Sequence, residues 1–296
     1  MRLKFWGVRG SIPCPGPDKV RFGGNTSCVQ VIGGSDIVIL DAGTGIRELG
    51  LQLAALRKPL KIHLLLTHTH WDHIQGFPFF TPIYIPGHEI FVYGPRALEK
   101  SLEEAVMFQM QYSYFPVKGV ELSSKIVFRE LDEEEFRAGD IEFQSKSMNH
   151  PIRVLAYRFA RAGSIGVYTG DNEPYYDVLA ETDRSADSGI HNRQQFIQEC
   201  NDRVVKFVKG SNLLIADAQY TDREYELKRG WGHSSISHVI DLAVGGDVKR
   251  LALFHHEPTH DDAILAAIEK EARSAAKKRS KALEVFSARE GQTVDV

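Results

Sequence analysis

The sequence predicts an α/β fold, because short apolar runs alternate with helical patterns along the whole chain. The runs are strand-length and are bounded by Gly, Asp, Pro or Ser, as expected of β-strands. Segments with helical periodicity fall between these runs rather than in a separate part of the chain. No linker, repeat or low-complexity tract divides the 296 residues, so we expect one domain over residues 1–296.

The predicted elements alternate in order along the chain. The N-terminal segment MRLKFWGVRGSIP has the pattern of a strand that runs into a turn. Further strands are expected at 27–33, 36–40, 61–66, 89–93, 125–130, 140–144, 164–169, 212–216 and 249–254. Helices are expected at 45–56, 95–110, 191–209, 234–244 and 261–279, the third of them within an insert over 183–210. Thr259 is a candidate N-cap of the last helix, and Asp261 and Asp262 favour its positive end.

The composition excludes several classes of protein. Hydrophobic residues make up 43% and charged residues 25% of the chain, which is typical of globular domains and excludes a wholly disordered protein. No apolar run approaches the roughly 18 residues that a membrane helix needs, so no membrane association is expected. Three cysteines are too few for a disulfide framework and favour the reduced cytoplasm. The net charge of −3 provides no general attraction to nucleic acid or anionic lipid.

The strongest local signal follows the predicted strand at 61–66. His68, His70, Asp72 and His73 lie within six residues of one another. Several imidazoles and a carboxylate at one strand end would be hard to bury without a partner that satisfies them all. Imidazole and carboxylate groups together suit zinc, and also manganese or iron. The segment therefore predicts a metal centre, although a polar loop that happens to be rich in histidine is the alternative.

This H-x-H-x-D-H pattern is the signature of the metallo-β-lactamase superfamily, which the chain resembles over nearly its whole length. The resemblance implies a four-layer αβ/βα sandwich with two divalent metal ions in a cleft at the edge of two sheets. His150, Asp171 and His255 match the remaining ligands of the family, and Asp171 matches the aspartate that bridges both ions. Asp41 matches an aspartate beside the ligands, and His256 is the alternative to its neighbour His255.

The resemblance also divides the ligands between the two ions. The first ion would be held by His68, His70, Asp171 and His150, and the second by Asp72, His73, Asp171 and His255. Two cations about 3.5–4 Å apart can hold a bridging hydroxide and stabilise the charge that develops on a substrate. Metal coordination lowers the pKa of water toward 7, so such a centre is suited to hydrolysis at neutral pH.

Three segments resemble the tRNase Z and phosphodiesterase branch of this superfamily. They are the opening F-W-G-V-R-G-S-I-P, the stretch F-V-Y-G-P-R-A-L at 91–98, and W-G-H-S-S at 231–235. The resemblance implies that His233 contacts the scissile phosphate and assists the leaving group. Asp217 would pair with His233 in place of the family's longer glutamate. Together with Asp72, these two residues are the expected catalytic groups.

The segment between His150 and Asp171 bears on the substrate. It is only long enough for a hairpin, whereas bacterial tRNase Z commonly carries a basic arm there that grips tRNA. With the net charge of −3, this predicts a small phosphodiester and no large nucleic acid. The opening and the W-G-H-S loop resemble those of bacterial phosphodiesterases that act on cyclic nucleotides or related small diesters, so the resemblance implies a 3′,5′-cyclic nucleotide as the leading candidate. Asn25 and Ser27 lie in a loop expected to reach the substrate. The aromatic and Met-rich stretch at 101–117 either packs in the core or stacks on a base.

Three other functions remain open from the sequence. A tRNase Z-like nuclease acting on short RNA would use the same ligands, as would a lactonase or thioesterase. A non-catalytic carrier on this fold would be expected to lose ligands, whereas every ligand position here is filled. The sequence does not distinguish the metal, and a homodimer is expected only because it is the commonest oligomeric state.

Overall fold

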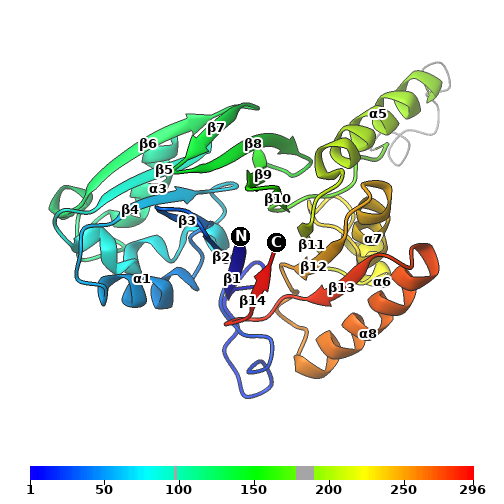
Figure 1. Cartoon of the computed structure of the whole chain (residues 1–296), viewed down its shortest axis with the longest axis horizontal. Helices are drawn as coiled ribbons and strands as arrows, with labels where there is room; N and C mark the ends of the chain where they lie inside the picture. The colour runs from blue at the N-terminus through cyan, green and yellow to red at the C-terminus, as the bar shows by residue number, and fades with distance from the viewer. Residues whose placement is uncertain (97–98, 178–189) are drawn as a thin grey trace.

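The computed structural model describes residues 1–96, 99–177 and 190–296. Within these residues the strands form two seven-stranded sheets that pack face to face, with helices on both outer faces (Figure 1). The predicted α/β class and the four-layer αβ/βα sandwich are therefore confirmed. The helix predicted from residue 95 and the insert predicted from residue 183 each fall partly outside the described residues.

The first sheet is built from the N-terminal half of the chain and the last strand. Its order is β14 (Thr293–Asp295), β1 (Arg2–Gly7), β2 (Cys28–Ile32), β3 (Ile37–Leu40), β4 (Lys61–Leu65), β5 (Glu89–Pro95) and β6 (Lys125–Leu131). Strands β3 to β6 run parallel, and the pairs from β14 to β3 are antiparallel. The chain ends therefore meet at the same edge of this sheet, where N and C lie in Figure 1.

The second sheet is built from the C-terminal half. Its order is β13 (Glu284–Ser287), β12 (Arg250–Phe254), β11 (Leu213–Asp217), β10 (Ser164–Tyr168), β9 (Val154–Arg161), β8 (Ile141–Met148) and β7 (Glu135–Ala138). Strands β10 to β13 run parallel, whereas β7 to β10 form an antiparallel meander. Each sheet thus has a parallel half, and ligands collect at the carboxyl ends of parallel strands.

The helices cover the outer faces. The first sheet carries α1 (Ile46–Ala54) and α3 (Leu102–Met107), and the second carries α5 (Ile190–Val208), α7 (Ile236–Gly245) and α8 (Asp262–Arg279). Two short helices, α2 (Trp71–Ile74) and α6 (Asp222–Lys228), lie in the segments that follow β4 and β11. Short 3₁₀ turns are η1 (Phe77–Phe79), η2 (Thr81–Tyr84), η3 (Phe108–Met110) and η4 (Gly119–Glu121). Helix α8 begins after Asp261, whose side chain accepts a hydrogen bond from the Ile264 amide. The predicted N-cap at Thr259 is therefore wrong by two residues, because Asp261 supplies the oxygen that the first turn needs.

Three apolar layers fill the space between the four structural layers. The central layer lies between the sheets and contains stacked aromatic rings, such as Tyr93, Phe136 and Phe143. The two outer layers lie under α1 and α3 on one side and under α5, α7 and α8 on the other. Strands β3, β4, β11 and β12 are therefore buried on both faces over most of their length, which explains why their apolar runs are continuous in sequence. Strands β7 and β8 instead alternate between buried and exposed residues.

Two hydrogen bonds join the sheets directly beneath the H-x-H-x-D-H segment. The buried Tyr157 hydroxyl of β9 donates to the Leu66 carbonyl at 2.6 Å, and the Leu155 amide donates to the Thr67 carbonyl at 2.9 Å. Leu66 and Thr67 are the two residues between β4 and His68. The end of β4 is thus held against the second sheet, which sets the position of the first ligand.

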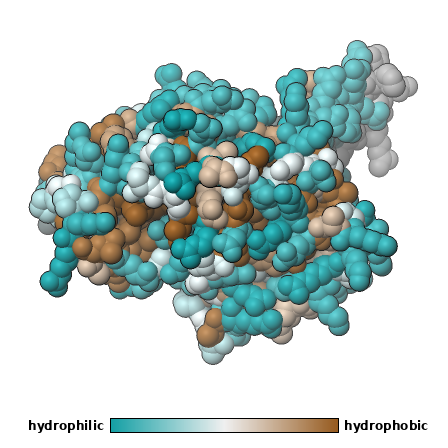
Figure 2. Space-filling model, viewed as in Figure 1, coloured by the Kyte–Doolittle hydropathy of each residue, from teal (hydrophilic) through white to brown (hydrophobic). Residues whose placement is uncertain are grey.

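The surface is mixed in character. In the view of Figure 2, hydrophilic residues cover α5 and α8, and apolar residues gather on the left, where α1 lies. Among the described helices, none combines the length and apolar character that crossing a bilayer requires.

Replacement of Tyr157 by Phe is expected to lower the free energy of unfolding by about 1–3 kcal/mol, because the buried Leu66 carbonyl loses its donor from the other sheet. Chemical denaturation at fixed metal concentration measures this change. Tyr114→Phe removes a hydroxyl from a side chain in an exposed segment and serves as the control. Equal free energies of unfolding for the two variants would show that this inter-sheet hydrogen bond does not stabilise the fold.

Candidate metal centre

All seven predicted ligands lie at one edge of the two sheets. His68 and His70 follow β4, Asp72 and His73 lie in α2, His150 follows β8, Asp171 follows β10 and His255 follows β12. They come from both halves of the chain, yet their side chains form two groups that share Asp171. The parallel halves of the two sheets therefore direct their carboxyl ends to one place.

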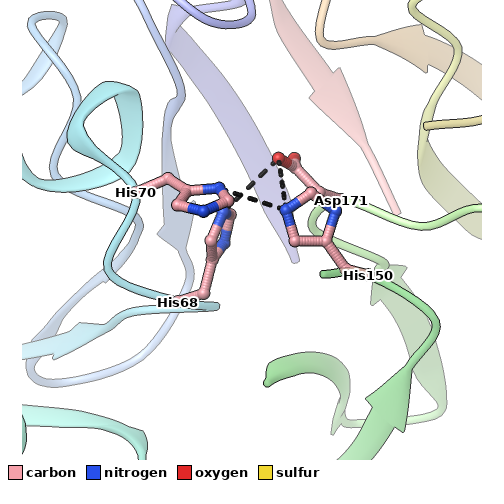
Figure 3. Close-up of side chains that lie close together, drawn as sticks. All are labelled: His68, His70, His150 and Asp171. Atoms are coloured by element: carbon pink, nitrogen blue, oxygen red, sulfur yellow. Dashed lines mark hydrogen bonds and ion pairs between the residues drawn. The ribbon is translucent and has the colours of Figure 1, made fainter. Parts of the chain in front are cut away.

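The first group consists of three histidines and the shared aspartate (Figure 3). The ligand atoms of His68, His70, His150 and Asp171 all lie within 4.8 Å of one another. His68 Nε2 is 3.4 Å from Asp171 Oδ2, and His150 Nε2 is 4.0 Å from the same oxygen. His70 Nδ1 is 3.1 Å from His150 Nε2. One carboxylate oxygen thus faces three imidazoles.

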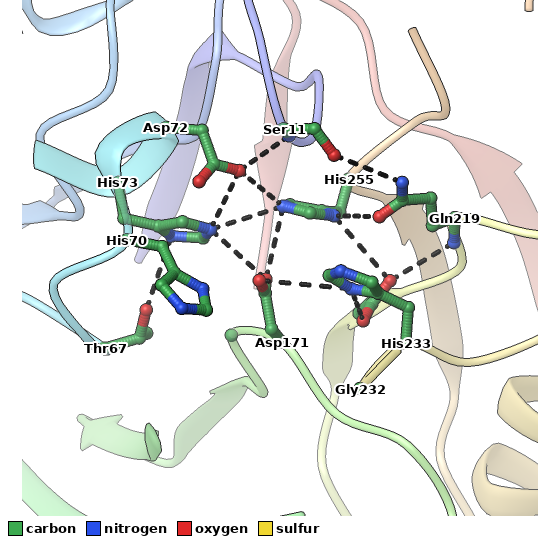
Figure 4. Close-up of polar contacts among 12 residues, drawn as sticks. Ser11, Thr67, His70, Asp72, His73, Asp171, Gln219, Gly232, His233 and His255 are labelled. Carbon is green, nitrogen blue, oxygen red and sulfur yellow. Dashed lines mark hydrogen bonds and ion pairs between the residues drawn. The ribbon is translucent and has the colours of Figure 1, made fainter. Parts of the chain in front are cut away.

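The second group lies on the other side of the same carboxylate (Figure 4). Asp171 Oδ1 is 3.2 Å from His73 Nε2 and 3.2 Å from His255 Nε2. Asp72 Oδ2 is 3.0 Å from His255 Nε2 and 3.4 Å from His73 Nε2. Because Oδ1 serves this group and Oδ2 serves the first, Asp171 has the geometry of a ligand that joins two sites.

Three of the ligand histidines have an acceptor on the ring nitrogen that faces away from the centre. His73 Nδ1 lies 2.8 Å from Asp41 Oδ2, His150 Nδ1 lies 2.8 Å from the Gly232 carbonyl, and His255 Nδ1 lies 3.0 Å from Gln219 Oε1. Each acceptor favours the tautomer with a proton on Nδ1. The lone pair of Nε2 is then directed inward, as a metal ligand requires.

These residues fit a pair of divalent cations. His73 Nε2 and His255 Nε2 lie 3.2 Å apart, which brings two lone pairs together unless a positive charge lies beside them. His68 Nε2 and Asp171 Oδ1 are buried and have no hydrogen-bond partner. Buried polar atoms are otherwise almost always satisfied. Three histidines with a carboxylate, and two histidines with two carboxylates, are donor sets that zinc and similar ions accept.

Burial keeps the first group in the form that binds metal. Burial, with His73 and His150 adding like charge, holds the pKa of His68 well below its usual value. Burial and the neighbouring His150 lower the pKa of His70 to about 4. Both imidazoles are therefore neutral at pH 7 and can donate their lone pairs to a cation.

Asp41 holds the second group in place. Its Oδ2 accepts from His73 Nδ1 at 2.8 Å and from the Tyr168 hydroxyl at 2.7 Å. Its Oδ1 accepts from the Thr67 amide at 2.7 Å. Asp41 is fully buried, so all of these partners come from the protein. The residue that the sequence marked as a neighbour of the ligands thus connects β3, β4, α2 and β10.

Backbone strain is concentrated around the second group. Ser11, Asp41 and His255 adopt φ values of 63°, 60° and 59°, in the left-handed region that residues other than glycine rarely occupy. Ser11 donates its amide to Asp72 Oδ2 at 2.7 Å. Such conformations cost of order 1–3 kcal/mol and persist where surrounding contacts impose them, often at functional sites.

A histidine–aspartate pair adjoins both groups. His233 Nδ1 lies 2.9 Å from Asp217 Oδ2 and 3.9 Å from Asp171 Oδ2 (Figure 4). Burial disfavours the charged ring, but Asp217 and Asp171 outweigh it and raise the pKa of His233 to about 9. The amides of Asn172 and Gln219 fix the Asp217 carboxylate at 3.1 and 3.2 Å. The shorter aspartate side chain therefore reaches His233.

Two residues that support the site carry no signal in the sequence. Gln219 orients His255, as its amide nitrogen also donates to Glu257 at 3.0 Å. The buried Glu173 carboxylate accepts from the amides of Gly230 and Gly232 at 2.8 and 2.9 Å. A glutamate or glutamine in a loop is ordinary in sequence, and its role depends on which distant backbone it meets.

The structure does not place every expected residue at the centre. Ser27 is fully buried, and the Asn25 side chain bonds Glu290 at 3.1 Å and Thr44 at 3.0 Å. Both therefore stabilise the N-terminal loop, and this arrangement does not favour substrate contact through them. His256 points away from the ligands and lies 2.9 Å from the Ala288 carbonyl, so it is His255 that joins the second group.

Comparison with known proteins agrees with this fold. A profile described as the beta-lactamase superfamily domain matches residues 37–196. Ribonuclease Z of Natronomonas pharaonis is 24% identical over 100% of this chain and 98% of its own length. The solved structure of human tRNase Z, short form, has a TM-score of 0.62 at 19% identity and covers 100% of this chain and 99% of its own. Unliganded yeast PDE1 has a TM-score of 0.64 at 15% identity, with coverage of 100% and 99%.

One expectation is overturned by these relatives. The short segment between His150 and Asp171 and the net charge of −3 predict that no large nucleic acid is bound. Proteins named ribonuclease Z nevertheless match nearly the entire chain, and one structural neighbour is a tRNase Z. The exclusion is therefore wrong, since neither a missing arm nor a modest net charge prevents a local surface from binding RNA.

Gly232→Ala is expected to weaken metal binding in the first group about tenfold or more. A Cβ at Gly232 would clash with His150 Nδ1, and the residue has φ +87°. The control is Gly163→Ala, where φ is +82° but no atom lies within 4 Å of the added Cβ. Calorimetric titration with zinc measures both. Equal losses would show that backbone strain, rather than displacement of His150, is responsible.

Asp41→Asn is expected to reduce the affinity of the second group for metal about 10–100-fold, because an amide cannot accept all the hydrogen bonds that orient His73 and Thr67. Competition with a chelator, read as metal retained per chain, measures the change. Asp247→Asn is a matched control, since Asp247 also has positive φ (50°) but is exposed and distant in the fold. An unchanged affinity in Asp41→Asn would contradict the orienting role.

Proposed function

Because this chain belongs to the beta-lactamase superfamily and has the fold of its metal-dependent hydrolases, we propose that it hydrolyses phosphodiester bonds in RNA. The observation that carries the proposal is the His233–Asp217 pair, 2.9 Å apart, beside the carboxylate shared by the two ligand groups. The similarity to proteins named ribonuclease Z over 100% and 88% of the chain supports RNA as the substrate.

The ligand groups define what each residue would hold. His68, His70 and His150 would hold one divalent ion, Asp72, His73 and His255 the other, and Asp171 both. Bound divalent ions would supply Lewis acidity toward the phosphoryl oxygens and lower the pKa of a water nucleophile. Asp41, Gln219 and the Gly232 carbonyl would keep the ligand rings oriented throughout turnover.

His233 would act on the phosphodiester itself. Its Nδ1 is occupied by Asp217, which leaves Nε2 as the nitrogen that can exchange a proton with a substrate oxygen. In this position an imidazole can donate a proton to the departing sugar oxygen and stabilise negative charge on the phosphoryl group. Glu173 contributes indirectly, because it fixes the backbone on both sides of Trp231, just before His233.

A small cyclic nucleotide is the second candidate substrate. The segment between His150 and Asp171 is filled by the β9–β10 hairpin, without an arm that could reach a distant part of tRNA. The structural likeness to yeast PDE1 is as high as that to human tRNase Z. Both substrates require the same attack on phosphorus, so the two candidates differ only in what surrounds the scissile bond.

His233→Ala is expected to lower kcat on phosphodiesters about 10²–10⁴-fold with unchanged metal content, since it removes the proton donor but no predicted ligand. The assay presents precursor tRNA with a 3′ extension, a short single-stranded RNA and 3′,5′-cyclic AMP to zinc-loaded and manganese-loaded protein. His238→Asn, in α7 and outside both ligand groups, is the control.

The pattern of products separates the candidates. Endonucleolytic cleavage of RNA that depends on His233 supports the main proposal, and turnover of cyclic AMP alone supports the second candidate. Absence of turnover on all three substrates, from protein that retains two metal equivalents, would contradict a phosphodiesterase.

A further inference from the structure

Trp231 is an exposed aromatic side chain on a rigidly held loop. It is 62% exposed, although its neighbours Gly230 and Gly232 both donate their amides to the buried Glu173 carboxylate. The Trp231 amide donates to the Lys228 carbonyl at 3.1 Å. The indole is thus presented to solvent by a fixed backbone two residues before His233. A rigid aromatic surface loses little conformational entropy when a flat ligand stacks on it.

A lysine lies over the same ring. Lys228, the last residue of α6, places Nζ 5.7 Å from the centre of the Trp231 ring and 4.5 Å from that of Tyr220. The Tyr220 ring in turn packs edge-on against His233, with ring centres 5.8 Å apart. The contacts therefore run from the Trp231 indole through Lys228 and the Tyr220 ring to His233.

The carboxylate next to Lys228, that of Glu257, also accepts hydrogen bonds from two other residues. Glu257 Oε2 lies 3.4 Å from Lys228 Nζ and accepts from Gln219 at 3.0 Å, while Oε1 accepts from Thr259 at 3.2 Å. An ammonium group has three donors, and Glu257 engages one of them. The Lys228 side chain is 30% exposed, so the group can meet an anionic ligand without leaving its place.

We propose that Trp231 and Lys228 form a subsite for the nucleotide adjacent to the scissile bond, in which the indole stacks on the base and the ammonium contacts a phosphate. The inference rests on the proposed function and specifies which part of the substrate is recognised beside His233. Aromatic stacking accepts any base, and a lysine reads charge rather than sequence. The subsite therefore selects single-stranded nucleotides over diesters that lack a base.

The first test compares two diesters with the same leaving group. Adenosine 5′-(p-nitrophenyl phosphate) carries a base, and methyl p-nitrophenyl phosphate does not. In Trp231→Ala holoenzyme, KM for the nucleoside diester is expected to rise about tenfold more than KM for the methyl diester. Trp231→Phe is expected to restore most of this preference. Leu227→Ala removes an 87% exposed apolar side chain from the same helix end and serves as the control.

The second test measures binding without turnover. The chain has three tryptophans, of which Trp6 is buried and Trp71 and Trp231 are exposed. In the Trp71→Phe variant, Trp231 is therefore the one exposed tryptophan whose fluorescence a ligand can quench. Quenching of this emission by a 2′-O-methyl hexa-adenylate reports stacking on Trp231. Lys228→Met is expected to weaken this binding and to reduce its salt dependence by about 0.7 in the slope of log Kd against log salt.

The outcomes distinguish the subsite from the function on which it rests. Equal losses of Trp231→Ala on both diesters, or quenching that is absent in active protein, would overturn the subsite and leave the phosphodiesterase intact. If the holoenzyme hydrolyses neither these diesters nor the RNA and cyclic AMP substrates, the proposed function fails, and oligonucleotide binding that depends on Trp231 and Lys228 would still support the subsite.

Discussion

The buried carboxylate of Asp171 is the constraint on which the rest of this structure depends. Each of its oxygens faces a different set of imidazoles, and it is fully enclosed. A buried carboxylate is stable only if positive charge or hydrogen-bond donors surround it. Burial opposes its ionisation, but the neighbouring His255 and His73 outweigh that effect and hold the pKa of Asp171 well below its usual value. A site for two cations is the arrangement that satisfies both the carboxylate and the inward-facing imidazole nitrogens.

The fold orients the ligand histidines through hydrogen-bond acceptors on the side of each ring that faces away from Asp171. Asp41 comes from the first sheet, and Gln219 and the Gly232 carbonyl come from loops of the second. The hydrogen bond from Tyr157 to Leu66 joins the sheets where the ligand segment begins. The orientation of the ligands therefore depends on how the two sheets pack. A substitution that disturbs the interface between the sheets would also disturb the ligand geometry.

The loop around His233 would connect this centre to the proposed substrate. Glu173, two residues after Asp171, binds the backbone of that loop, whose Gly232 carbonyl holds His150. The same loop presents Trp231 to solvent. Ligand geometry, proton transfer and recognition of a neighbouring nucleotide would thus be coupled through a few hydrogen bonds.

The sequence by itself determined the α/β class, most strands and the ligand types, because these depend on local periodicity and on a short motif after one strand. Helix α2 is too short for periodicity to reveal, and the exclusion of a large nucleic acid failed because net charge carries no spatial information. Only the tertiary structure distinguished His255 from His256, since their surroundings come from segments far apart in the chain. It also placed Glu173 and Gln219 in the site, for the same physical reason: a hydrogen bond depends on distance in space, which the order of residues does not record.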